Sequence, residues 1–163
     1  MKIRISILLS IVWVACSVLA DDSKIPPQAI NALHFSTNTV LYALDGESFY
    51  QGTNTDAVLY GSKILGQTKL NSEQSKIAIG AFERAMAAGN GLLGAHCFDP
   101  GHALRVMAEG ETYDFLLCYK CGWLSVVHKD KEIARVGAMG TPEQLNKLLA
   151  LLKIPIPKGI DQH

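Results

Sequence analysis

The clearest hydrophobic pattern in the chain is a helical one between residues 71 and 88. Apolar side chains recur there at helical spacing and fall on one face: Ile77, Ala78, Ala81, Phe82, Ala85 and Met86. Asn71 stands at a capping position, and Gln74 follows three residues later, as in a capping box. Gly89 comes next and is typical of a helix end. The pattern predicts an amphipathic helix over about residues 71–88.

A second helical pattern lies near the end of the chain. Thr141 and Pro142 suit the cap and the first position of a helix. The apolar residues that follow share one face: Leu145, Leu148, Leu149 and Leu152. Pro155 and Pro157 then prevent the helix from continuing. We therefore expect a helix with a buried leucine face over about residues 142–152.

Other parts of the chain contain short segments rich in β-branched and aromatic residues, separated by polar turns. Four of them form two predicted hairpins, 104–108 with 112–119 and 123–128 with 133–136. The segment 39–44 is also typical of a strand, and Asp45-Gly46 after it is a turn signal. Residues 57–70 contain a further strand, in which Gly61 and Gly66 suggest a bulge or a close approach of another backbone.

These elements predict a fold of the α+β class. We expect an antiparallel sheet of about four to six strands, joined by hairpins and packed against the two main helices. A single domain is predicted over residues 36–157. A lead-in at 21–35, with a short helix, precedes the domain, and a tail at 158–163 follows it.

The first twenty residues have the pattern of a secretory signal peptide. Lys2 and Arg4 form a positive start, and an apolar run from 5 to 14 follows. This run is shorter than the about 20 residues that a membrane-spanning helix needs. Val18-Leu19-Ala20 then resembles a cleavage site, so that residues 1–20 are predicted to be removed after Ala20.

A lipoprotein is the alternative, with Cys16 as the lipidated residue. Trp13 occupies a position at which such signals usually carry leucine, and this favours ordinary cleavage. For a bacterial source, the mature protein is predicted to be periplasmic or secreted, and no later segment is apolar enough to cross a bilayer.

The charge balance argues against nucleic-acid binding. Loss of Lys2 and Arg4 with the signal peptide leaves 13 basic residues against 15 acidic ones. A nucleic-acid interface would need clustered Lys and Arg side chains. We expect instead that a partner would be another envelope or secreted protein.

The candidate chemistry is concentrated in three cysteines and one histidine: Cys97, His102, Cys118 and Cys121. On an unbroken strand the Cα atoms of Cys118 and Cys121 would lie about 10 Å apart. A disulfide requires less than about 7 Å. The two side chains would also point to opposite faces of the sheet. The pair therefore converges only if the chain turns there, and Gly122 makes such a turn feasible because glycine tolerates positive φ.

Two arrangements follow. If the chain turns, Cys118 and Cys121 form a knuckle, and Cys97 and His102 complete a Cys₃His site of the kind that binds zinc. The Asp99-Pro100-Gly101 turn would fold His102 back beside Cys97. If the strand is straight, Cys97 forms a disulfide with Cys118 or Cys121, and the third thiol stays free. Oxidising compartments favour the disulfide, which is therefore the leading interpretation.

A catalytic role has weaker support in the sequence. A redox-active Cys-x-x-Cys usually stands at a helix N-terminus, and no helix is predicted after Cys121. Cys97 and His102, with Asp99 as orienter, could form a nucleophilic pair, but no oxyanion hole is recognisable. The Gly-x-Gly-x-x-Gly at 89–94 follows a helix, where a dinucleotide-binding loop must follow a strand. We assign no catalytic residue and no cofactor, zinc being the exception if the metal site forms.

Two segments of the chain resemble a known sequence signature: Cys97-Phe98-Asp99-Pro100-Gly101-His102 and Cys118-Tyr119-Lys120-Cys121. They resemble a family of small uncharacterised bacterial exported proteins with a Cys-Phe-x-Pro-x-His signature followed by Cys-x-x-Cys. The resemblance covers about residues 59–157, and Gly101 replaces an arginine that is common in the family. It implies that the three cysteines and His102 act as one unit, and it implies no activity.

The sequence thus favours an exported binding or interaction module, stapled by a disulfide among Cys97, Cys118 and Cys121, over an enzyme. A metal-binding domain that uses Cys97, His102, Cys118 and Cys121 is the first alternative. A thiol-dependent enzyme that uses Cys97 and His102 is the second.

Overall fold

The computed structural model describes residues 24–49, 57–89 and 97–159. In chain order, its elements are α1 (Pro27–His34), β1 (Asn38–Phe49), β2 (Val58–Leu59), β3 (Ser62–Lys69), α2 (Ser72–Gly89), β4 (His102–Ala108), β5 (Glu111–Cys118), β6 (Trp123–His128), β7 (Lys131–Gly137) and α3 (Glu143–Leu151). The strands form one antiparallel sheet in the order β2-β3-β1-β4-β5-β6-β7. The predicted signal peptide at 1–20 lies outside the described residues.

The α+β class and the antiparallel sheet are confirmed, with more elements than the sequence predicted. The described residues contain seven strands, where about four to six were expected. They contain the two main helices, α2 and α3, and also α1, which lies in the lead-in where a short helix was expected. The helices α2 and α3 lie where the apolar stripes predicted them. The capping box is present, since the Asn71 Oδ1 accepts from the Gln74 N–H at 2.9 Å and Gln74 Oε1 accepts from the Asn71 N–H at 2.9 Å.

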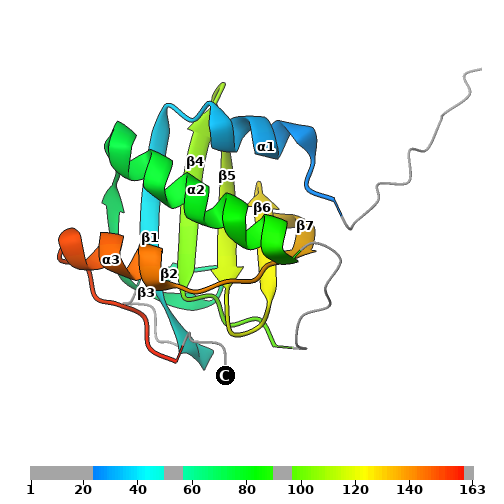
Figure 1. Cartoon of the computed structure of the whole chain (residues 1–163). Coiled ribbons are helices and arrows are strands. Elements are labelled where there is room, and N and C mark those ends of the chain that lie inside the picture. The colour runs from blue at the N-terminus through cyan, green and yellow to red at the C-terminus, as the bar shows by residue number, and fades with distance from the viewer. Residues whose placement is uncertain (1–23, 50–56, 90–96, 160–163) are drawn as a thin grey trace, which may run out of the picture.

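All three helices cover the same face of the sheet (Figure 1). The main core fills the space between them and the strands. Phe82 of α2 and Leu145 and Leu149 of α3 are fully buried there, together with Leu104 and Phe115 of the sheet. Complete burial of each such side chain contributes about 1.5–3 kcal/mol to stability. Among the described residues, no helix is long and apolar enough to span a membrane.

The opposite face of the sheet carries a second, smaller core. Its buried members are Tyr42, Leu44, Leu59, Ala103, Leu116 and Val127, and Phe98 packs against them. The sheet curls over this core. The evidence is a hydrogen bond of 2.7 Å, which the hydroxyl of Tyr60 at the β2–β3 turn donates to Asp114 on β5. Two strands, β1 and β4, separate the β2–β3 hairpin from β5 in the sheet order, so that only curling can bring Tyr60 and Asp114 together.

The segment 57–70 is a hairpin rather than one interrupted strand. Tyr60 and Gly61 form a two-residue turn in which both have positive φ, 47° and 86°. Gly66 does mark a bulge, since the register of β1 against β3 shifts beside it. A Cβ at this position would lie 2.8 Å from Ile154 Cγ2, so the group that approaches Gly66 closely is a side chain and not another backbone. Of the two alternatives suggested for the glycines, the bulge is therefore the one confirmed at Gly66.

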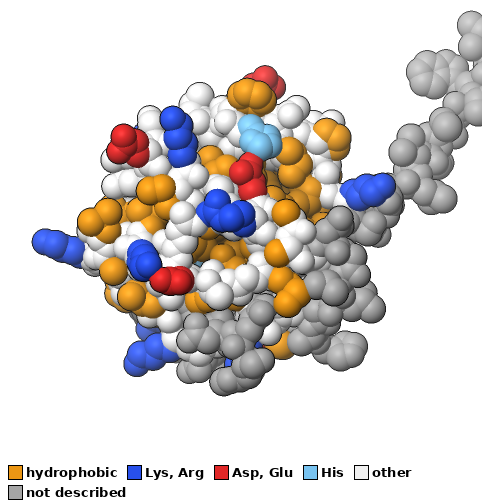
Figure 2. All heavy atoms as spheres, in the orientation of Figure 1, with side chains coloured by type: hydrophobic (Ala, Val, Ile, Leu, Met, Phe, Trp, Pro, Cys, Tyr) orange, Lys and Arg blue, Asp and Glu red, His pale blue; other side chains and the backbone are white. Residues whose placement is uncertain are grey.

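Charges of both signs are interspersed on the helix-bearing side. Figure 2 shows Lys and Arg side chains scattered among Asp and Glu over the described part of this face. Helix α3 illustrates the mixture, since Glu143 in its first turn pairs with Lys147, four residues later, at 2.6 Å. Among the residues that this view draws in colour, basic side chains do not gather into one patch.

Candidate functional site

The site is built around the turn that joins β5 to β6. Cys118 is the last residue of β5, and it pairs with Trp123, the first residue of β6. Between them the chain turns, with Gly122 at φ 72° and its N–H donating to the Cys118 carbonyl at 3.0 Å. This is the positive φ that glycine supplies without steric cost. The turn brings the Cα atoms of Cys118 and Cys121 to 5.2 Å, and the two cysteines form a disulfide.

The disulfide is buried and receives backbone hydrogen bonds. Cys118 and Cys121 are each 1% exposed. The Cys121 N–H donates to Cys118 Sγ at 3.1 Å, and the Asp99 N–H donates to Cys121 Sγ at 3.2 Å. Hydrogen bonds of this kind stabilise a sulfur that carries negative charge. Each sulfur of the disulfide therefore has one backbone N–H group directed at it.

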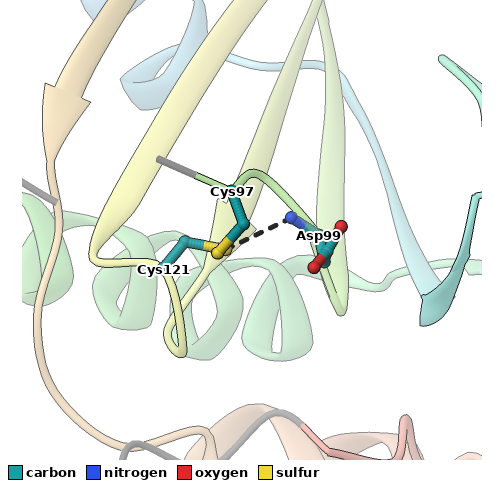
Figure 3. Close-up of side chains that lie close together, drawn as sticks. All are labelled: Cys97, Asp99 and Cys121. Atoms are coloured by element: carbon teal, nitrogen blue, oxygen red, sulfur yellow. Dashed lines mark hydrogen bonds between the residues drawn. The ribbon is translucent and has the colours of Figure 1, made fainter. Parts of the chain in front are cut away.

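Cys97 lies beside this disulfide and keeps a free, exposed thiol. Its Sγ, the Sγ of Cys121 and a carboxylate oxygen of Asp99 all lie within 4.8 Å of one another. Figure 3 shows the side chains of Cys97 and Cys121 meeting at their sulfur ends, with the backbone nitrogen of Asp99 aimed at the Cys121 sulfur. We call Cys97, Asp99, Cys118 and Cys121 the thiol cluster.

The loop that carries Cys97 and Asp99 is fixed from several sides. Phe98 packs against the second core, and the guanidinium of Arg135 lies 4.7 Å from the centre of its ring. Pro100 and Gly101 are buried, and the Gly101 carbonyl accepts from the Leu44 N–H at 2.9 Å. The position of Cys97 next to the disulfide is thus set by packing of the loop.

The disulfide differs from the predicted ones. The sequence predicted a bond from Cys97 to Cys118 or Cys121, and the structure joins Cys118 to Cys121 and leaves Cys97 free. The reason is the turn at Gly122, which brings the i, i+3 pair within the range of about 7 Å that a disulfide needs. The straight strand, on which the predicted pairing depended, does not form. Cys97 still lies near Cys121, but through packing rather than a covalent bond.

The structure does not bring His102 to the cysteines. Along β4, Ala103 belongs to the second core and Leu104 to the main core, so that His102 points to the helix-covered side. Along β5, Leu117 belongs to the main core, and Cys118 therefore points to the other side. The sheet separates the two side chains. Asp99 occupies the place in the cluster that the predicted Cys₃His site gave to His102, and the predicted pair of Cys97 with His102 is not assembled either.

His102 instead forms a buried polar contact between the sheet and α3. Its Nε2 lies 3.0 Å from Asn146 Oδ1, and its ring packs edge-on against Tyr119 with 6.2 Å between ring centres. Its Nδ1 is buried without a hydrogen-bond partner among the described residues. Burial lowers the pKa of His102 to about 4, and the hydrogen bond to Asn146 opposes this shift only in part. The imidazole is therefore neutral at physiological pH.

A second polar group, which the sequence did not reveal, lies on the face of the sheet opposite the helices. The Asp114 carboxylate accepts from Arg105 Nε at 2.7 Å and Nη2 at 2.8 Å, and from the Tyr60 hydroxyl at 2.7 Å. Burial and this hydrogen bond raise the pKa of Tyr60 well above its usual value. We call Tyr60, Arg105 and Asp114 the Asp114 cluster. Its charges are paired within the fold, and it ties the β2–β3 turn to β5.

A scan against protein-family models finds no match for the chain, and searches of curated proteins and of solved structures find none either. The resemblance to a family of exported bacterial proteins therefore stays a prediction. The chemistry of the chain has to be inferred from its own geometry.

Proposed function

We propose that this protein is an exported thiol–disulfide exchange domain that oxidises thiols of a partner in an oxidising compartment. In this proposal the predicted signal peptide at 1–20 directs export. The observation that carries the proposal is a free, exposed thiol, Cys97, next to a buried disulfide. Its Sγ lies within 4.8 Å of the Cys121 sulfur.

The burial of the disulfide explains why a third cysteine is useful. Exchange requires that a thiolate attack a disulfide sulfur directly, so that access controls the rate. Cys118 and Cys121 are each only 1% exposed, which hinders a partner thiol from reaching them. Cys97 is exposed and lies beside Cys121, so that it can react with both the disulfide and the partner.

The first step is internal. The Cys97 thiol loses its proton to water, and its sulfur attacks Cys121 Sγ. A Cys97–Cys121 bond forms, the Cys118–Cys121 bond breaks, and Cys118 leaves as a thiolate that takes a proton from water. The Cys121 N–H, which donates to Cys118 Sγ at 3.1 Å, stabilises this leaving group.

The second step transfers electrons from the partner. A partner thiolate attacks the exposed Cys97 sulfur, Cys121 leaves as a thiolate, and Cys97 and the partner share a mixed disulfide. A second thiol of the partner then attacks the partner sulfur that is bonded to Cys97. The partner's own disulfide forms, and Cys97 is released as a thiolate that takes a proton from water. In total, the partner loses two electrons and two protons and gains a disulfide, and Cys118 and Cys121 become thiols. The substrate class is therefore a protein or small molecule with two neighbouring thiols.

The arrangement differs from thioredoxin-like sites, in which the reactive thiol lies at a helix N-terminus. Here the turn after Cys118 leads into β6, and the cysteines lie at the end of two paired strands. The features that support reactivity are instead the two N–H groups that donate to the sulfurs of Cys118 and Cys121.

The test is to compare how fast reduced glutathione opens the Cys118–Cys121 disulfide in the wild type and in Cys97→Ser, with a chelator present. Acid-quenched samples are alkylated and analysed by mass spectrometry. We expect the variant to react at least about tenfold more slowly, because the external thiol must then attack a buried sulfur. Thermal unfolding of both proteins serves as the control for folding.

Equal rates in two folded proteins would overturn the proposal. The disulfide would then be a structural cross-link, and the binding module predicted from the sequence would be the better description of the domain.

A further inference from the structure

We infer that the thiol cluster, once its disulfide is reduced, is a binding site for one zinc ion, with Cys97, Cys118, Cys121 and Asp99 as ligands. The inference does not depend on exchange with a partner, because it requires only that the two disulfide-bonded cysteines be reduced. It also names a ligand set that differs from the predicted Cys₃His set, since Asp99 takes the place of His102.

The distances among the donor atoms are close to those of a tetrahedral site. Zinc–sulfur bonds of about 2.3 Å place neighbouring ligand atoms of a tetrahedron about 3.7 Å apart. Cys97 Sγ, Cys121 Sγ and an Asp99 oxygen already lie within 4.8 Å of one another without an ion. Side-chain rotations that move the donor atoms by about 1 Å or less would bring these three atoms within bonding distance of one metal ion.

Cys118 supplies the fourth donor. Its sulfur is bonded to that of Cys121 in the oxidised protein, so reduction leaves both sulfurs next to the same point. The Cys118-Tyr119-Lys120-Cys121-Gly122 turn, with Gly122 at φ 72°, has the spacing of a zinc knuckle. The backbone N–H groups of Cys121 and Asp99 donate to the two sulfurs and stabilise their negative charge.

The donor set selects the class of ion. Three thiolates and one carboxylate favour a borderline-soft ion such as Zn²⁺ over Mg²⁺ or Ca²⁺, which prefer oxygen ligands. Each thiol releases a proton to solvent when it binds the ion. The sulfur atoms of a disulfide do not carry this charge, so that the oxidised and the metal-bound forms exclude each other.

His102 provides a matched control for the ligand set. It is fully buried on the other side of the sheet, with its Nε2 3.0 Å from Asn146 Oδ1. His102→Gln keeps a side-chain amide that can bond Asn146 and removes the imidazole. Asp99→Asn keeps the size of the side chain at Asp99 and removes its charge. The two variants therefore separate a site with three cysteines and Asp99 from one with three cysteines and His102.

The experiment titrates protein that has been reduced with a phosphine and freed of metal, using Co²⁺ as a spectroscopic probe and then Zn²⁺ as competitor. We expect one ion per chain and sulfur-to-cobalt charge-transfer bands. Affinity should fall at least about tenfold in Asp99→Asn and in Cys97→Ser, and should stay within about twofold in His102→Gln. Far-UV circular dichroism of each reduced protein shows that it remains folded.

Three results would overturn the inference: no charge-transfer bands in reduced, folded wild-type protein, unchanged affinity in Cys97→Ser, or a loss in His102→Gln without a loss in Asp99→Asn. The glutathione experiment contains a chelator and starts from the disulfide form. Its failure would therefore leave the metal site standing, and failure of metal binding would leave the exchange proposal standing.

Discussion

Two aspartates of this protein are used in opposite ways. Asp114 is buried, and its carboxylate accepts two hydrogen bonds from Arg105 and one from Tyr60. Asp99 lies in a loop beside two sulfurs, and its carboxylate has no hydrogen-bond partner among the described residues. The first carboxylate is fully engaged in the fold. The second keeps its charge available next to an exposed thiol.

The comparison shows how to distinguish polar clusters that stabilise from those that can react. A buried charge is costly unless it is paired, so the charges of the Asp114 cluster satisfy each other. In the thiol cluster, packing of Phe98 and the turn at Gly122 hold the reactive atoms in place. Substitutions in the Asp114 cluster should therefore reduce stability, and substitutions of Cys97 or Asp99 should change chemistry with little effect on stability.

Asp114→Ala is expected to have the largest effect on stability. It leaves Arg105, whose side chain is 33% exposed, without its partner and removes the acceptor for Tyr60. We expect the free energy of unfolding to fall by about 3 kcal/mol, measured by urea denaturation. Glu111→Gln removes an acid that is 44% exposed and should change it by less than about 0.5 kcal/mol. Equal effects of the two substitutions would show that the Asp114 cluster contributes no more to stability than an exposed acid does.

Acidification should destabilise the protein through His102. The pKa of His102 is about 4 in the folded protein, below the about 6.5 of an exposed histidine. Between these values the unfolded chain binds the additional proton, so stability is complete above pH about 6.5 and falls as the pH approaches 4. Between pH 6.5 and pH 4, the titration of His102 should lower the free energy of unfolding by about 3 kcal/mol.

The measurement for His102 is urea denaturation of the wild type and of His102→Gln between pH 7 and pH 4. The wild type should lose more stability than the variant, which lacks the titrating imidazole. Parallel pH profiles would show that the histidine is not buried in its neutral form.

Removal of the disulfide should have a smaller effect. The double variant Cys118→Ala with Cys121→Ala opens a covalent loop between residues only three apart in sequence. A loop this short restricts the unfolded chain only modestly, and we expect a loss of about 2 kcal/mol in the free energy of unfolding. A loss near zero in chemical denaturation would mean that the cross-link does not contribute to stability.

Cys97→Ser should have the smallest effect on stability. Cys97 is exposed and forms no disulfide in the structure, so we expect a change of less than about 0.5 kcal/mol in the free energy of unfolding. A loss of 2 kcal/mol or more would indicate that Cys97 is covalently bonded in the folded protein, as the sequence predicted.

Local patterns in the sequence predicted the helices and the hairpins well. The apolar stripe and the capping residues Asn71 and Gln74 correspond to α2 and its observed capping box. The turn signal at Asp45-Gly46 does not end the strand, because β1 continues to Phe49. It coincides instead with a break in the register, since the pairing with β3 passes from Asp45–Lys63 directly to Phe49–Ser62.

The candidate site was harder to predict because it depends on which face each strand residue occupies. Residues 113–118 of β5 are all buried, with cores on both sides of the sheet. Residues 115–118 form a continuous apolar run, and such a run does not indicate the direction of any one side chain. The sequence therefore grouped His102 with the cysteines, although the sheet lies between them. It identified Gly122 as the residue that would permit a turn, and did not predict that the turn would form a disulfide.

The central claim is that Cys97 lies within bonding reach of Cys121. The most direct test is a peptide map of Cys118→Ser after exposure to oxidised glutathione. We predict a Cys97–Cys121 disulfide in this variant, because removal of Cys118 leaves Cys121 free beside the Cys97 sulfur. If Cys97 and Cys121 carry separate glutathione adducts or stay free, and are never joined, the claim is contradicted.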